Sequence, residues 1–227
     1  NPPDDLPAEV GADADGNVVT VLTAGRTVTQ DAETGALLGE VDLQLGNMSA
    51  AALAPKSRAL AVVVDGHASV YDLPSGEAHD IPGADANDVV FSGTRLLVQR
   101  LDGTIEVWGD GQRQIERRIR GKVTVYGDLS ADDQGHLLAR AREDGTVSLT
   151  DLDTGTEIGV LGSATQSIAP KTAVVFDASG RRVFTLAEQS LDSVLVTRDV
   201  SDAGLLGTTC RIATVDISQS DWDSTTG

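Results

Sequence analysis

The feature that most constrains this chain is a short pattern of turn, strand and turn that recurs about every 42 residues. Its clearest copy is EDGTVSLTDLDTG, residues 143–155, where Val147 and Leu149 lie on one face of the strand and Asp-Thr-Gly closes the segment. Asp144 and Gly145 suit a type I′ turn, because both central residues of that turn need positive φ. The strand ends at Asp151, seven residues after the first turn begins.

Five copies of the pattern keep this seven-residue offset. Their first turns begin at positions 24, 65, 102, 144 and 192, which are 41, 37, 42 and 48 residues apart. Aromatic residues make up only 3 % of the chain, so the core must come from Val, Leu, Ile and Ala in short runs that favour strands. A period of about 40–45 residues with four strands per repeat is typical of propeller blades. The pattern therefore predicts an all-β propeller of four-stranded blades.

The repeats divide the chain into an arm, five blades and a tail. We expect a proline-rich, acidic linker or entering arm over residues 1–9, blades over residues 10–204 and a tail over residues 205–227. The expected blades are residues 10–48, 49–86, 87–122, 123–166 and 167–204. A longer polar loop is expected at residues 188–193. In the tail, Ser218 followed three residues later by Asp221 is a capping signature, which predicts short helical turns.

Three segments carry a family resemblance. DGTIEVWGDG (102–111), DGTVSLTDLDTG (144–155) and DGHASVYDLPSG (65–76) resemble the repeat of the WD-repeat β-propeller family, and the resemblance covers about residues 10–204. Two departures stand out: only Trp108 occupies the family's Trp position, and the Gly-His pair that usually opens a repeat is missing at all five starts. The family's Asp-His network is therefore not expected, and blade stability should come from apolar packing between neighbouring sheets.

The tail carries a narrower resemblance, which bears on the larger protein. TCRIA (209–213), DIS (216–218) and Asp221-Trp222 resemble the C-terminal segment of bacterial WD-repeat proteins. In those proteins the propeller commonly follows a P-loop signalling NTPase, protease or kinase domain, although this chain has no Gly-Lys-Ser/Thr loop and no kinase signature. The resemblance implies the C-terminal part of a larger bacterial signalling protein. Together with Asn1 in place of Met, it favours the last five blades of a seven-bladed ring, although five repeats can also close a small ring.

Charge and cysteine content bear on partners and compartment. The formal charge of −18, from 35 acidic and 17 basic residues, argues against nucleic-acid partners and against an anionic membrane surface. The single cysteine, Cys210, excludes an internal disulfide, and nothing in the sequence requires an oxidising compartment. No apolar run approaches the roughly 20 residues of a membrane span, and no signal peptide is visible. We therefore expect a cytoplasmic protein.

The sequence offers few candidates for chemistry. Residues 13–17 resemble the start of a calcium loop, but the glycine comes too early, and a blade turn is the better interpretation. The three histidines, His67, His79 and His136, share no metal-ligand spacing. One basic run is interpreted as a charged outer strand that protects its edge, with docking of an acidic partner as the alternative: Arg113, Arg117, Arg118, Arg120 and Lys122. No catalytic residue, cofactor or metal is predicted.

These observations favour a non-catalytic interaction or sensor module, which recognises a protein partner or an upstream domain through the face built from its hairpin loops. The expected contacts flank two of the hairpin turns: Arg100, Asp102, Arg142, Glu143 and Asp144. The alternative is a propeller enzyme, a hydrolase or lyase, with its site at the central channel. A quinone-type dehydrogenase propeller is a third hypothesis, but its Trp- and Gly-rich closing motif is not found here.

Overall fold

A computed structural model of the chain describes residues 7–12, 17–22, 26–43, 48–54, 59–73, 75–109, 111, 114–120, 129–142, 144–162, 172–177, 179–189 and 192–201. Within these residues the regular elements are all β-strands, arranged in five antiparallel sheets. Each sheet is a meander whose strand order in space follows the chain, and we call each one a blade.

The strands of the first three blades alternate apolar and polar residues or form short apolar runs, as strands packed between sheets do. Blade 1 contains β1 (Pro7–Ala12), β2 (Val18–Leu22), β3 (Arg26–Gln30) and β4 (Leu37–Asp42). Blade 2 contains β5 (Ala50–Leu53), β6 (Ala59–Val64), β7 (His67–Asp72) and β8 (Ala78–Asp80). Blade 3 contains β9 (Ala86–Ser92), β10 (Arg95–Arg100), β11 (Ile105–Trp108) and β12 (Ile115–Ile119).

The last two blades continue the series. Blade 4 contains β13 (Leu129–Ala131), β14 (Leu137–Ala141), β15 (Val147–Asp151) and β16 (Thr156–Leu161). Blade 5 contains β17 (Thr172–Phe176), β18 (Arg182–Gln189) and β19 (Asp192–Asp199). The predicted all-β propeller of repeated blades is thus confirmed, although blade 5 has three strands rather than four within the described residues.

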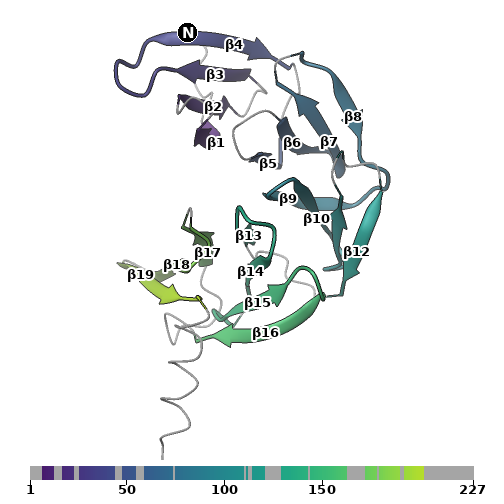
Figure 1. Cartoon of the computed structure of the whole chain (residues 1–227), viewed down its shortest axis with the longest axis vertical. Helices are drawn as coiled ribbons and strands as arrows, with labels where there is room; N and C mark the ends of the chain where they lie inside the picture. Colours follow the sequence, from purple (N-terminus) through teal and green to yellow (C-terminus); the bar gives the residue numbers. More distant parts are fainter. Residues whose placement is uncertain are drawn as a thin grey trace, which may run out of the picture.

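The blades fan out along an arc, with the first strand of each blade on the inside and the last on the outside (Figure 1). Consecutive blades contact one another through these inner strands, β1 with β5, β5 with β9, β9 with β13 and β13 with β17. The arc is open between blade 1 and blade 5 (Figure 1), and within the described residues no strand of blade 1 pairs with a strand of blade 5. The repeats are therefore an open series and not a closed five-bladed ring.

Two features differ from the sequence expectation, and a third lies outside the described residues. β1 begins at Pro7, so the first blade includes three residues of the segment assigned to the arm. The prediction of a long polar loop at residues 188–193 is wrong. Glu188 pairs with Ser193 and Gln189 with Asp192, so the hairpin ladder continues through these residues. The tail, residues 205–227, with its expected helical turns and Cys210, lies outside the described residues.

The hairpin turns of blades 2 and 4 differ, and the type I′ prediction is wrong for the segment on which it was made. In blade 2, Asp65 (φ 50°) and Gly66 (φ 78°) are both left-handed, as a type I′ turn requires. In blade 4, Gly145 has positive φ but Asp144 does not. Its carboxylate instead accepts hydrogen bonds from the backbone N–H (2.9 Å) and hydroxyl (2.6 Å) of Thr146, which form an Asx turn.

A second Asx turn explains the recurring spacing from strand end to Thr-Gly. The Asp31 carboxylate accepts from the N–H and hydroxyl of Thr34 at 2.6 and 2.7 Å. The Asp151 carboxylate does the same with Thr154, at 2.7 and 3.0 Å. An aspartate at or directly after the end of the third strand therefore fixes the turn that leads into the outer strand, in blade 1 as in blade 4.

The core lies between the blades. Apolar clusters fill each of the four contacts between consecutive sheets, and the one between blades 2 and 3 includes Phe91, Leu96 and Trp108. Hydrogen bonds also cross between blades, for example from the Ser92 hydroxyl to the Asp132 carbonyl at 2.9 Å and from the Phe176 N–H to the Ser130 hydroxyl at 3.1 Å. The expectation of apolar packing between sheets is confirmed. None of the described residues builds a helix with the length and apolar character that crossing a membrane requires.

Candidate functional site on the hairpin face

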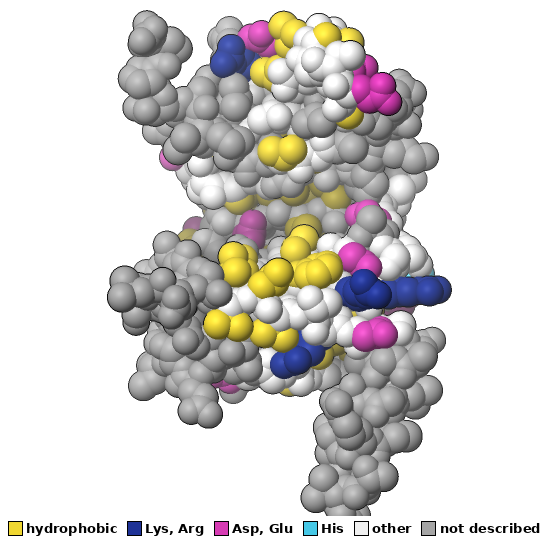
Figure 2. All heavy atoms as spheres, turned by 90° about the vertical axis from the view of Figure 1, so that its left-hand side faces the viewer, with side chains coloured by type: hydrophobic (Ala, Val, Ile, Leu, Met, Phe, Trp, Pro, Cys, Tyr) yellow, Lys and Arg dark blue, Asp and Glu magenta, His cyan; other side chains and the backbone are white. Residues whose placement is uncertain are grey.

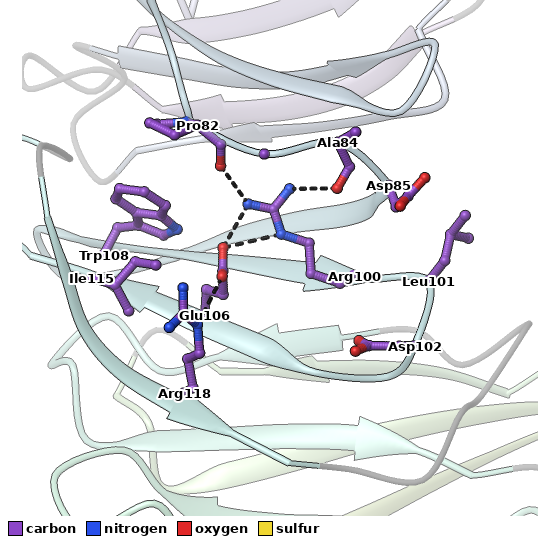
Figure 3. A pocket seen from close by; sticks show the side chains of 11 residues that line it. Pro82, Ala84, Asp85, Arg100, Leu101, Asp102, Glu106, Trp108, Ile115 and Arg118 are labelled. Carbon is purple, nitrogen blue, oxygen red and sulfur yellow. Dashed lines mark hydrogen bonds and ion pairs between the residues drawn. The ribbon is translucent and has the colours of Figure 1, made fainter.

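On one side of the arc, the loop from blade 2 to blade 3 lies beside the turns between the second and third strands of these two blades. We call this side the hairpin face. Between blades 2 and 3 it has a pocket of about 790 Å³ beside Arg100, the Arg100 pocket (Figure 3). Its walls come from the loop that links the two blades, from the hairpin of blade 3 and from β11 and β12: Pro82, Gly83, Ala84, Asp85, Arg100, Leu101, Asp102, Glu106, Trp108, Ile115 and Arg118.

Arg100, the last residue of β10, is held on all sides in this pocket. Its Nη2 donates to the Pro82 carbonyl at 2.8 Å and its Nη1 to the Ala84 carbonyl at 3.2 Å. Its Nε and Nη2 also reach Glu106 Oε2 at 3.0 and 2.5 Å (Figure 3). The two charged side chains are only 10 % and 9 % exposed. Arg100 thus acts as a clamp on the loop between the blades.

Strand register brings the partners of this clamp together. Glu106 lies opposite Val98 on β10, so it shares a sheet face with Arg100 two residues further on. On its other side Glu106 lies opposite Arg118 of β12, whose Nε donates to Glu106 Oε1 at 3.1 Å. A single buried carboxylate therefore forms ion pairs with two arginines, one of them inside the pocket wall and one at its rim.

The loop over residues 82–85 is fixed by backbone hydrogen bonds as well. Leu101 N–H donates to the Asp85 carbonyl at 2.9 Å, and Ala86 N–H donates to the Gly66 carbonyl at 2.8 Å. The loop therefore lies between the hairpins of blades 2 and 3 and is bonded to both. Gly83 is required here, because it has φ +104° and a Cβ would lie 3.0 Å from Arg100 Nη2.

The groups left accessible around the pocket include an apolar tip, two carboxylates and the rim guanidinium of Arg118, which is 62 % exposed and paired with Glu106. Leu101 is 58 % exposed at the end of the hairpin, and Asp85 and Asp102 beside it are also exposed. Thr104 N–H donates to the Asp102 carboxylate at 2.8 Å, and hydrogen bonds from Thr104 lower the pKa of Asp102. This carboxylate therefore stays ionised at neutral pH and adds negative charge beside Leu101.

The other expected contacts lie on the next hairpin. Arg142 pairs with Glu157 of β16, and Asp144 is exposed, with its pKa lowered by the hydrogen bonds from Thr146. Glu143 lies outside the described residues. The structure thus brings Arg100 and Asp102 together at the Arg100 pocket and places Arg142 and Asp144 on the neighbouring blade. Both arginines are engaged in ion pairs, so the exposed charge at the two hairpins is mainly acidic.

Sequence reasoning missed Glu106, Trp108 and Leu101 as parts of this site. A signal for Glu106 was present, because it interrupts the apolar run of β11, while Arg118 stands opposite it on β12 and Arg100 lies two residues beyond its partner Val98 on β10. Trp108 is buried in the pocket wall, and its indole N–H has no hydrogen-bond partner among the described residues. Leu101 had no sequence signal, because its exposure depends on how the loop over residues 82–85 packs beside it.

The opposite side of the arc carries a second pocket, of about 650 Å³, between the turns of blades 4 and 5. There Asp153 accepts from Arg95 Nη1 at 2.8 Å and lies 3.2 Å from His136 Nδ1, and these contacts lower the pKa of Asp153. Arg117, from the basic run, donates to the Asp153 carbonyl at 2.5 Å and so joins blade 3 to blade 4. Within the described part of the chain, no three His, Cys, Asp or Glu side chains gather into a metal-binding group.

Comparison with known proteins adds no relative. No protein-family model matches the chain, and no curated protein matches it.

Proposed function

We propose that this chain is a non-catalytic interaction module, which binds a partner protein at the hairpin face around the Arg100 pocket. The observation that carries the proposal is a rigid surface with an apolar tip. The Arg100 clamp and two backbone hydrogen bonds fix the loop over residues 82–85, while Leu101 stays 58 % exposed beside it. A surface that is already ordered loses little conformational entropy on binding, which favours affinity and specificity.

The charge of this surface indicates the chemistry of the partner. Asp85 and Asp102 are exposed on either side of Leu101, whereas Arg100 is buried in its ion pair. A complementary segment would present an apolar side chain to Leu101 and lysine or arginine to the carboxylates. The partner we infer is a basic protein segment with an apolar anchor.

Catalysis is not part of the proposal. In a propeller enzyme the titratable groups would gather near the axis, and within the described residues the inner strands of the blades carry only Glu9 and Asp88 as titratable side chains. A fold of repeated blades fits an interaction role. The wider assignment, to a WD-repeat sensor at the C-terminal end of a bacterial signalling protein, is likewise proposed, on the strength of the three repeat segments and the tail residues 209–222.

Selection of displayed peptides on the purified chain tests the function and the surface together. We expect enrichment of segments with an apolar residue flanked by lysine or arginine. Leu101→Asp and Asp102→Lys should each weaken the selected binders by roughly tenfold or more, since central anchors carry most of the binding energy. Val160→Asp, on an exposed outer-strand position of blade 4, is the matched control and should leave affinity unchanged. Selected binders that tolerate Leu101→Asp would contradict the assignment.

A further inference from the structure

The contact between consecutive blades repeats residue by residue. On the face that each blade turns toward the next, the second strand contributes Ala61 in blade 2, Leu97 in blade 3 and Ala139 in blade 4, all 0 % exposed. Strand register places Phe184 at this position in blade 5, because Phe184 and Ala139 both follow the turn aspartate by seven residues. Blade 5 therefore carries the same half of the interface as the blades before it.

In blade 5 this half-interface is exposed. Val175 pairs with Phe184 and Leu186 with Leu195, so the four side chains form one apolar patch, which we call the blade-5 end face. Val175, Leu186 and Leu195 are 55, 40 and 64 % exposed, respectively. Viewed from the open side of the arc, Figure 2 shows hydrophobic side chains gathered on the lower part of the molecule, below a recess. A contiguous apolar patch of this kind marks an interaction surface.

Blade 1, on the other side of the opening, carries the complementary half. Val10 pairs with Thr20, and Thr20 pairs with Val28, so the three side chains share one face of the sheet. In the other blades, the equivalent face packs against the preceding blade. Val10 is 57 % exposed, whereas its counterparts Val89 in blade 3 and Val174 in blade 5 are buried. The two sides of the opening therefore present the two halves of a contact. The same contact is complete at all four junctions between consecutive blades.

We propose that at least one further antiparallel blade occupies this opening, carried by the same polypeptide ahead of β1. A further sheet with an apolar face would cover the blade-5 end face in the same way as blade 5 covers Ala139 of blade 4, so the added blade would continue the existing packing. The connection follows from topology, because each outer strand leads into the inner strand of the next blade. An added blade would lead into β1 in the same way and would pack against Val10.

The test measures thiol reactivity on the complete product of the gene that encodes this sequence, beside the chain of residues 1–227. Both carry Cys210→Ser and one new cysteine, either Leu195→Cys on the blade-5 end face or Leu101→Cys on the hairpin tip as the matched exposed control. We expect maleimide to modify both positions at similar rates in the 227-residue chain. In the complete product, modification of position 195 should slow by roughly a hundredfold or more, because it then requires an opening of the packed blades, while position 101 is unchanged.

Three results would overturn the proposal. Equal reactivity of position 195 in the two proteins would show that nothing in the complete product covers the end face. Protection in the 227-residue chain that disappears on dilution would assign the face to a second copy. Protection in that chain at every concentration would assign it to residues within the chain itself.

Discussion

Blade 3 and blade 5 show that one strand pattern can be core or surface. Ile105 and Leu195 occupy equivalent positions on the third strands of blade 3 and blade 5. Ile105 pairs with Gln99, and Leu195 pairs with Leu186. Ile105 is 1 % exposed and Leu195 is 64 % exposed. The sheet around each residue is similar, but blade 3 has a neighbour on both faces. The difference teaches that burial in this fold is decided by the next blade and not by the local sequence.

The largest loss of stability is expected at Glu106, a buried charge that blade 3 has and blade 5 lacks. The equivalent position in blade 5 is occupied by Val196. Glu106→Ala should lower the free energy of unfolding by about 3–5 kcal/mol, because it leaves Arg100 buried without a counter-charge. Chemical denaturation measures the loss. Glu157→Ala, which removes the half-exposed partner of Arg142, is the matched control and should cost less than about 1 kcal/mol. Equal losses would mean that neighbouring blades do not shield the blade 3 pair.

The matched apolar positions test the comparison itself. Ile105→Ala should lower the free energy of unfolding of the 227-residue chain by about 3 kcal/mol, because it leaves a cavity between two packed sheets. Leu195→Ala should cost less than about 0.5 kcal/mol, because that side chain is mostly in water. The difference between the two urea midpoints is the decisive quantity. Similar midpoints would break the distinction between internal and end faces.

The stability cost of a substitution at a turn glycine should not depend on whether its blade lies at the end of the arc or inside it. Gly35 in blade 1 and Gly76 in blade 2 have φ of +69° and +71°, and a Cβ at either would meet nothing within 4 Å. Gly35→Ala and Gly76→Ala should therefore each cost about 1–2 kcal/mol from backbone strain alone. Thermal unfolding of the two variants measures this. A much smaller cost at Gly35 would show that blade 1, at the end of the arc, does not hold its turn.

Lowering the pH should produce the smallest loss of stability, and the loss should be the same for blade 3 and blade 5. Hydrogen bonds from Thr104 and Ser201 lower the pKa values of Asp102 in blade 3 and Asp199 in blade 5 from the usual 3.8. A lowered pKa stabilises the fold above the unfolded value, and this contribution is lost as pH falls below about 4. The urea midpoint should therefore drop between about pH 5 and pH 2. Asp102→Asn and Asp199→Asn should flatten the drop equally, and a response confined to Asp102 would refute a purely local origin.

Elements whose signals are local could be predicted from the sequence. β15 ends at Asp151, as the repeat predicts, since its limits are set by turn residues on both sides. β1 could not be predicted, because Pro7 opens a segment that reads as a linker, and its strand exists through pairing with β2. The hairpin ladder of blade 5 could not be predicted either, because its end residues are polar and resemble a loop in sequence, although they pair across β18 and β19.

The candidate site divides in the same way. Arg100 and Asp102 could be placed on a hairpin from the repeat alone. The clamp could not be predicted, because two of its acceptors are the carbonyls of Pro82 and Ala84, and a backbone carbonyl leaves no trace in sequence. A repeat count does not say whether the first and last sheets meet, so the sequence favours an open arc only through the resemblance of its tail and through Asn1, while the five repeats also allow a small closed ring.

X-ray scattering of the monomeric 227-residue chain in solution tests the central claim most directly. The claim is that five sheets pack in series and leave blade 1 and blade 5 apart (Figure 1). The predicted result is a scattering curve that fits the open arc. A curve that fits only a closed ring, with β1–β4 packed on β17–β19, would contradict it.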